Sequence, residues 1–189
     1  MISESILQGE RVRLRPVAEE DLPLFVAWFN DPEVRYWLSM SDAPEFTLES
    51  EQEWYDEMRS DPSRVIWCIE TEDGRPIGNL GLHAIDEAHG RATFGIAIGE
   101  KECWGRGYGT EALRQVLRYA FQEMGLRRVV LEADEDNARG IRCYEKCGFM
   151  REGLLRGHRL RRGEPVNDVV MAVLREEWER GAGGGSDGG

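Results

Sequence analysis

A glycine-rich run, CWGRGYGTE, ends at Glu111 and holds the residues best suited to chemistry. Glycines alternate with other residues at Gly105, Gly107 and Gly109, so the backbone can turn tightly and approach a ligand without Cβ atoms in the way. Helical periodicity follows directly, over residues 110–124. The first N–H groups of such a helix have no intrahelical partner and lie at the positive end of its dipole. The run therefore predicts a loop that binds a pyrophosphate.

Two other interpretations of this run are open from the glycines alone. A lone glycine pattern can be a tight strand-to-helix turn that binds nothing. A dinucleotide-binding unit is suggested by the strand that follows the helix and ends near Glu132 and Asp134. The G-x-G-x-G spacing and the position of this unit in the second half of the chain argue against a dinucleotide site.

The elements before the loop are predicted from periodicity and turn residues. Alternation in the run RVRLR indicates an opening strand, and helical segments follow over residues 18–29 and, after a further aromatic-rich helical segment, over residues 48–59. Turn signals at Asp73-Gly74 and His89-Gly90 separate three predicted strands, which cover residues 64–70, 76–85 and 91–98. These strands form an antiparallel meander that leads into the loop.

The elements after the loop complete the sheet. Apolar residues repeat at three- and four-residue intervals up to Gly125, which ends the helix. A strand over residues 128–133, a short helix over 137–147 and extended structure over 149–174 follow. We expect one mixed α/β (α+β) sheet in a single domain, residues 1–180, and a flexible glycine-rich tail over residues 181–189.

Charge and cysteine usage narrow the function classes. The chain has 189 residues and a net charge of −12, which repels nucleic acid and attracts cationic ligands, although such a charge also serves solubility alone. Neither a signal peptide nor a run of about 20 apolar residues is present, so we expect a cytoplasmic protein without nucleic acid or membrane partners. The cysteines lack paired C-x-x-C spacing and are expected to be reduced thiols rather than zinc ligands.

Two blocks together resemble the signature blocks of the GNAT superfamily of acyl-CoA N-acyltransferases. They are IAIGEKECWGRGYGTEAL, residues 96–113, and NARGIRCYEKCGF, residues 137–149. Three further segments are similar to the RimJ/RimL-type branch, namely the run RLRP, residues 77–83 and the run NDVVMAVLREEW. The likeness therefore extends over about residues 8–178. The resemblance implies a mixed, mostly antiparallel sheet with helices on both faces and a splayed central strand pair. It also implies acetyl-CoA as the co-substrate, with no metal.

The resemblance implies a set of cofactor-binding residues. The strand before the loop would pair its backbone with the pantetheine arm and direct an N–H at the thioester oxygen, or would simply be a buried strand. The family loop begins with Arg or Gln, whereas this chain has Trp104, which would pack against the cofactor. Arg106 adds positive charge beside the loop amides. The implied set is Ile96, Ala97, Ile98, Trp104, Gly105, Arg106, Gly107, Tyr108, Gly109, Thr110, Asn137 and Arg142.

Asn137 and the arginines after it have two interpretations each. Asn137 could cap the helix that it opens or hydrogen-bond the pantetheine, as in the proteins that it resembles. The family often has a serine where this chain has Gly140, which removes one hydroxyl contact. Arg139 and Arg142 could meet the nucleotide phosphates or remain solvated.

The catalytic residues follow from the chemistry of a thioester and an amine. Tyr144 matches the family tyrosine that faces the thioester sulfur, where a hydroxyl can protonate the departing thiolate. An amine must lose a proton before it attacks, yet Thr93 stands where relatives often have a glutamate. The substitutes are His83, Asp134, Glu100 and Glu102, acting through water.

The resulting hypothesis is an N-acetyltransferase. It would move an acetyl group from acetyl-CoA to a primary amine, on a protein N-terminus, a polyamine or another small cationic molecule, by direct attack in a ternary complex. A non-catalytic acyl-CoA binding or sensing module is the alternative, because the family glutamate is absent. A homodimer is suggested by family likeness only. Aromatic residues of the early helices are candidates for the acceptor pocket, namely Trp28, Tyr36, Trp37, Trp54 and Tyr55.

Overall fold

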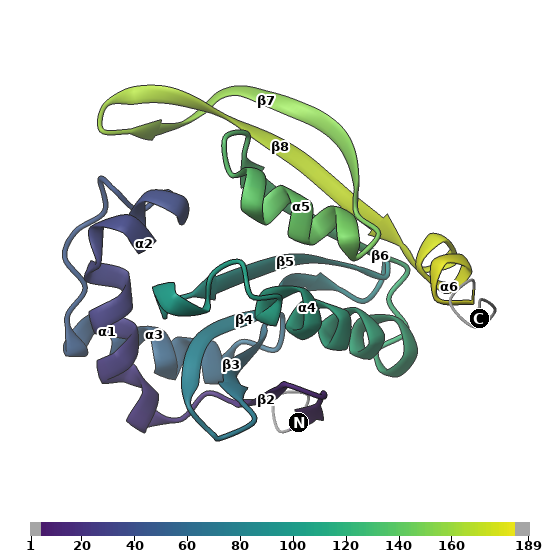
Figure 1. The fold of residues 1–189 in the computed structure, drawn as a ribbon, viewed down its shortest axis with the longest axis horizontal. Helices are drawn as coiled ribbons and strands as arrows, with labels where there is room; N and C mark the ends of the chain where they lie inside the picture. The colour runs from purple at the N-terminus through teal and green to yellow at the C-terminus, as the bar shows by residue number, and fades with distance from the viewer. Residues whose placement is uncertain (1–4, 184–189) are drawn as a thin grey trace.

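A computed structural model describes residues 5–183 and contains one eight-stranded sheet in the order β1-β2-β3-β4-β5-β6-β8-β7 (Figure 1). Neighbouring strands are antiparallel except for β5 and β6. The strands are β1 (Leu7–Gln8), β2 (Val12–Pro16), β3 (Val65–Thr71), β4 (Pro76–Asp86), β5 (Arg91–Ile98), β6 (Arg128–Asp134), β7 (Met150–Arg161) and β8 (Glu164–Leu174). The predicted mixed, mostly antiparallel sheet is confirmed.

The helices lie between these strands. They are α1 (Leu22–Asn30), α2 (Pro32–Trp37), α3 (Leu48–Ser60), α4 (Tyr108–Arg118), α5 (Ala138–Lys146) and α6 (Arg175–Gly183), with 3-10 turns η2 (Glu19–Asp21) and η3 (Lys101–Cys103) and a π-helical turn η4 (Tyr119–Glu123). The predicted helix over residues 18–29 was too long at its start. Pro23 has no N–H to bond the carbonyl of Glu19, so the chain makes a 3-10 turn before α1.

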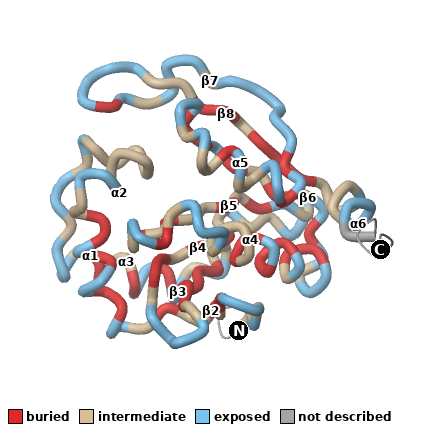
Figure 2. Tube along the Cα trace, viewed as in Figure 1, coloured by how far each residue is buried: buried red, intermediate tan, exposed pale blue. Residues whose placement is uncertain are grey.

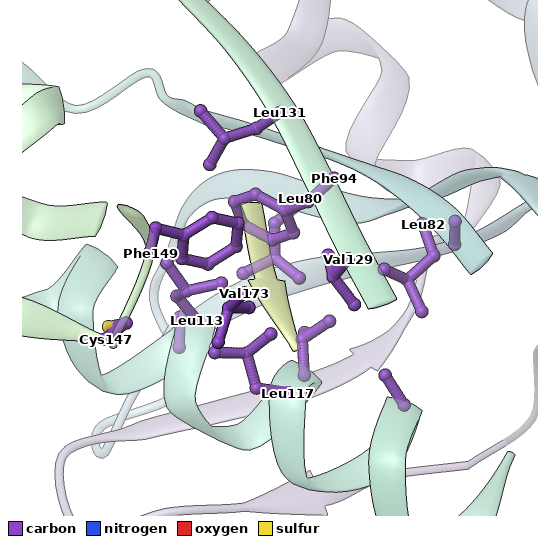
Figure 3. Close-up of a cluster of buried hydrophobic side chains, with 14 of the residues drawn as sticks. Leu80, Leu82, Phe94, Leu113, Leu117, Val129, Leu131, Cys147, Phe149 and Val173 are labelled. Carbon is purple, nitrogen blue, oxygen red and sulfur yellow. The ribbon is translucent and has the colours of Figure 1, made fainter. Parts of the chain in front are cut away.

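Each face of the sheet packs against its own helices. On one face, Leu113 and Leu117 of α4 join Leu80, Phe94 and Val129 of the strands in a buried cluster (Figure 3). On the other face, apolar residues of α1 and α3 pack against Ile66 and Cys68 of β3 and Ala97 of β5. The expected helices on both faces are confirmed.

The two parallel strands at the centre of the sheet separate. Arg91 pairs with Arg128, Ala92 with Val129 and Thr93 with Val130, and the β5–β6 ladder ends there. Beyond Thr93, β5 continues to Ile98 paired only with β4. The splayed central pair is therefore confirmed, and it leaves one edge of residues 95–98 without a strand partner within the described residues.

After α5, the strands β7 and β8 form a long hairpin that extends beyond the end of that helix (Figure 1). Most of β7 is exposed, whereas buried residues gather in the central strands and α4 (Figure 2). Of the predicted tail over residues 181–189, the first three residues belong to α6 and the rest lie outside the described residues. No helix in the described part of the chain combines the length and apolar character that a bilayer span requires.

Candidate active site

A cavity of about 620 Å³ opens where β5 and β6 separate. Its walls come from the strands β4, β5 and β6, from the loop before α4, from α5, and from the early helices α2 and α3. Most residues of the predicted site line it, including His83, Ile96, Ala97, Ile98, Trp104, Gly105, Gly107, Gly109, Thr110, Asp134, Asn137, Arg142 and Tyr144. The fold thus brings the two sequence blocks, residues 96–113 and 137–149, to one place.

The glycine loop is built to approach a ligand closely. Gly105 and Gly107 have φ angles of 72° and 88°, which favour glycine, and a Cβ at Gly105 would meet nothing within 4 Å. Gly107 precedes the first residue of α4, and within the described residues no side chain caps this helix. The first amides of α4 are therefore free donors at the positive end of the helix dipole. This open cradle fits the pyrophosphate of a coenzyme A group.

Arg11 joins the loop from the start of β2, which sequence reasoning missed. Its Nη1 donates to the backbone oxygen of Arg106 over 3.1 Å, and its guanidinium lies 4.4 Å from the ring centre of Tyr108. Arg106 lies 5.6 Å from the same ring. The carboxylate of Glu111 accepts the backbone N–H of Arg11 over 2.8 Å and so fixes this approach. Two cations therefore flank the loop, where one was predicted.

Trp104 connects the end of β5 to α5. Its indole N–H donates to the carbonyl oxygen of Ile98 over 2.8 Å, and the guanidinium of Arg139 lies 3.9 Å from the centre of its rings. Such a short cation–π contact holds Arg139 on the indole face. Trp104 lines the cavity at the same time, as expected for a residue that packs against the cofactor.

Asn137 caps α5 in this structure. Its Oδ1 accepts the backbone N–H of Gly140 over 2.9 Å, and its side chain also lines the cavity. The capping interpretation therefore describes the structure, and the contact to pantetheine stays a prediction. Arg142, one turn further on, is exposed at the cavity wall, where its charge is free to meet a phosphate.

Tyr144 lies between two aromatic rings at the cavity wall. The ring centres of Phe94 and Phe149 are 6.5 Å and 6.1 Å away. Burial raises the pKa of the Tyr144 phenol above its usual value, so the hydroxyl keeps its proton at neutral pH. Within residues 5–183 this hydroxyl has no hydrogen-bond partner. It is therefore a free donor facing the cavity.

Cys143 also lines the cavity. Its Sγ accepts a hydrogen bond from the Thr110 hydroxyl over 3.3 Å, and Cys147 lies one turn further along α5. The Cys147 thiol and the Thr110 hydroxyl lower the pKa of the Cys143 thiol. Cys147 in turn donates to the backbone oxygen of Thr110 over 3.5 Å. The start of α4 is thus joined through two thiols to the middle and to the C-terminal cap of α5.

The four candidates for the general base lie in different surroundings. His83 pairs with Thr93 across β4 and β5 and lines the cavity. Burial, followed by the charge of Arg64, lowers the pKa of the His83 imidazole below its usual value. The ring is therefore neutral at neutral pH and can accept a proton.

The acidic candidates are engaged by arginines. Glu100 accepts the indole N–H of Trp28 over 2.8 Å and pairs with Arg75, which also holds Glu102. Asp134 lines the cavity, but it pairs with the buried Arg161 and accepts the backbone N–H of Asp136. Of the four candidates, His83 alone combines a place on the cavity wall with a side chain that is free of an ion pair in the described residues.

Two further carboxylates line the cavity on the side of the early helices, and sequence reasoning did not select them. Glu51 of α3 is only 4% exposed, and Glu132 of β6 lies 3.4 Å from His158. A signal for Glu51 was present in the sequence. It shares the buried face of α3 with Tyr55 and Met58 at helical spacing, so a charged residue interrupts an apolar stripe.

The aromatic candidates for the acceptor pocket divide into two groups. Trp37 and Trp54 line the cavity. Trp28 instead donates to Glu100, Tyr36 accepts from Arg161 over 3.0 Å, and Tyr55 packs in the core of α3 and β3. The acceptor side of the cavity is therefore both aromatic and acidic.

Comparison with known proteins agrees with this geometry. Residues 11–150 match the model of the acetyltransferase (GNAT) domain. The chain is 30% identical over 168 residues to the spermidine N(1)-acetyltransferase of Escherichia coli, covering 88% of each protein, and 31% identical over 176 residues to the uncharacterized N-acetyltransferase YoaA of Bacillus subtilis, covering 90% of this chain and 97% of the relative.

A solved structure shares the fold. The spermidine N-acetyltransferase from Vibrio cholerae, in complex with CoA and spermine, superposes with a TM-score of 0.83 at 23% identity, over 90% of this chain and 99% of that one. The free amides before α4, the splayed strands and these matches lead to one conclusion. The chain belongs to the GNAT family of acetyltransferases and is an N-acetyltransferase that uses acetyl-CoA.

Proposed function

We propose that this enzyme acetylates a primary amine of a small cationic molecule by direct attack in a ternary complex. The observation that carries the proposal is one cavity lined by the phosphate-binding loop and Tyr144 on one side and by His83, Glu51 and Glu132 on the other. Carboxylates and aromatic rings favour a cationic acceptor. The E. coli relative is named for spermidine, which supports the same class. A cytoplasmic RimJ/RimL-type enzyme is part of this proposal.

Separate groups of residues in the chain hold the diphosphate and the pantetheine of acetyl-CoA. Bound acetyl-CoA supplies an acetyl group activated as a thioester. The amides at the start of α4, with Arg11 and Arg106 beside them, hold the diphosphate. The unpaired edge of residues 95–98 is a second row of backbone groups that can hold the pantetheine and face the carbonyl oxygen. Together these contacts place the acyl carbon near the acceptor amine, which raises the rate through proximity.

Two side chains move protons. The neutral imidazole of His83 takes a proton from the acceptor ammonium, directly or through water, so that the nitrogen lone pair is free. The N–C bond forms as the C–S bond breaks, the electron pair leaves on sulfur, and the nitrogen releases its second proton to solvent as the amide forms. The Tyr144 hydroxyl donates its proton to that sulfur and is reprotonated from solvent.

The test is release of free thiol from acetyl-CoA with a panel of polyamines, aminoglycosides and N-terminal peptides. Transfer to at least one small cationic amine is expected. Tyr144→Phe should lower kcat by about 10- to 100-fold, because it removes the proton donor, and should leave the Kd for CoA unchanged in calorimetry. If CoA binds and no amine raises thiol release above background, the chain is an acyl-CoA binding module instead.

A further inference from the structure

Glu51 is a buried carboxylate without a partner. It lies in the first turn of α3 and is 4% exposed. Within the described residues no donor hydrogen-bonds its side chain and no cation pairs with it. Burial alone raises the pKa of this carboxyl above its usual value. Its side chain lines the wall of the cavity.

Aromatic rings line the same cavity, and one of them, Trp54, lies one turn after Glu51 on α3. Phe29 of α1, Trp37 of α2, Phe46 and Trp54 line it together with Glu51. The centres of Phe29 and Phe46 are 5.5 Å apart, so these two rings pack against each other. A carboxylate within aromatic rings is a site for an alkylammonium ion, since the carboxylate supplies the charge and the ring faces add cation–π attraction.

Fold stability does not explain Glu51. An ionised carboxylate that is buried without a partner destabilises a protein, and an apolar residue at this position would continue the stripe of Tyr55 and Met58. The favourable contact of an acidic residue with the helix dipole is already made by Glu49, which is exposed in the same turn. The fold alone would therefore be served better by an apolar residue at this position, which is what we expect of a residue kept for a ligand.

We propose that Glu51 binds the second, non-reacting ammonium of a linear diamine or polyamine and so directs the free primary amine at the thioester. The inference rests on the proposed function, which it makes more specific. His83 and Glu51 line the cavity from different elements, His83 from β4 and Glu51 from α3. One carboxylate thus selects the acceptor, while the imidazole receives its proton.

The experiment compares 1,4-diaminobutane with butylamine, which has the same four-carbon chain but lacks the second amine and its charge. Glu51→Gln keeps the shape of the side chain and removes its charge. We expect kcat/KM for the diamine to fall about 10- to 100-fold, mainly through KM, while kcat/KM for butylamine changes less than about threefold. Glu51→Asp should keep part of the selectivity. Glu53→Gln on the exposed face of α3 is the matched control and should change neither value.

Two further measurements separate a ligand site from a structural role. The Tm of the free Glu51→Gln protein should equal or exceed that of the natural chain, and calorimetry on the CoA complex should find weaker binding of 1,4-diaminobutane. Equal losses for both amines, or a lower Tm with unchanged selectivity, would overturn the role of Glu51. Absence of transfer to any amine by the natural chain would overturn the proposed function, whereas the calorimetric comparison would still decide whether Glu51 binds a diamine.

Discussion

His83 of β4 lies directly opposite Thr93 of β5, the position where the family resemblance implies a glutamate. Both residues are on the face of the sheet that carries Gly95 and the acceptor side of the cavity, and a Cβ at Gly95 would lie 3.4 Å from Nε2 of His83. The imidazole therefore lies beside β5 near Gly95, two residues beyond Thr93. The base that we propose thus comes from the strand next to the one on which relatives often carry a glutamate.

Replacing His83 should remove the fall of kcat at acid pH. Burial lowers the pKa of His83 below 6.5, so the natural enzyme should lose activity as pH falls below about 6.5 and the ring becomes protonated. His83→Gln should lower kcat by about 100-fold and flatten this acid limb. Measurement of kcat by thiol release between about pH 5 and 8, for the natural enzyme and for His83→Gln, tests this. An acid limb that persists in His83→Gln would assign the base to another group.

The same histidine should make folding pH-dependent. Its pKa is lower in the folded chain than in the unfolded chain, so between the two values the unfolded chain binds more protons. The contribution of His83 to the free energy of unfolding is fully present above about pH 6.5. It is lost as the pH falls toward the pKa that His83 has in the folded chain. Urea midpoints of the natural chain should fall across this window more steeply than those of His83→Gln.

The elements that position the site were largely predictable because they are locally encoded. The strand over Arg91–Ile98 was predicted with its observed bounds, and the loop glycines were predicted from their spacing. Helix α4 begins at Tyr108, two residues before the predicted start, because Gly107 in its left-handed conformation takes the capping position.

Contacts between distant segments were not predictable from one sequence. Arg11 reaches Arg106 across 95 positions, and the partner of Asp134 is Arg161 of the β7 hairpin. Periodicity assigns each of these residues to an element but gives no information on which elements meet. Burial of Glu51 was implied by its place in the apolar stripe, yet its approach to the cavity depends on how α3 packs on the sheet.

Arg15 should be important for stability. It donates from Nη2 to Asp21 over 2.7 Å and from Nε to Glu70 over 2.6 Å, and these carboxylates belong to residues that are only 3% and 4% exposed. Arg15→Ala would leave two buried charges with fewer partners, so the free energy of unfolding should fall by about 3–5 kcal/mol in urea titrations. Arg151→Ala removes an exposed pair with Glu145 and should change it little. Equal effects of the two substitutions would contradict this account.

Gly107→Ala should separate backbone strain from ligand binding. Its φ of 88° costs any other residue about 1–2 kcal/mol, and the new Cβ would lie 3.6 Å from Nη1 of Arg11. We expect this loss of stability together with an increase of about tenfold in the Kd for CoA, since the loop amides would shift. Gly74→Ala is the matched control, because Gly74 has a φ of 80° at a remote turn. It should be destabilised similarly and bind CoA normally.

Cys143 should be the thiol most readily alkylated, and coenzyme A should protect it. The Cys147 thiol and the Thr110 hydroxyl lower its pKa, so the reactive thiolate forms at a lower pH than in a free cysteine. Iodoacetamide should therefore label Cys143 faster than the buried Cys68, whose pKa is raised by burial to about 12. Thr110→Val should slow the labelling at neutral pH, because it removes the donor to Sγ. Mass spectrometry with and without CoA gives the rates, and labelling that CoA does not slow would place Cys143 outside the bound ligand.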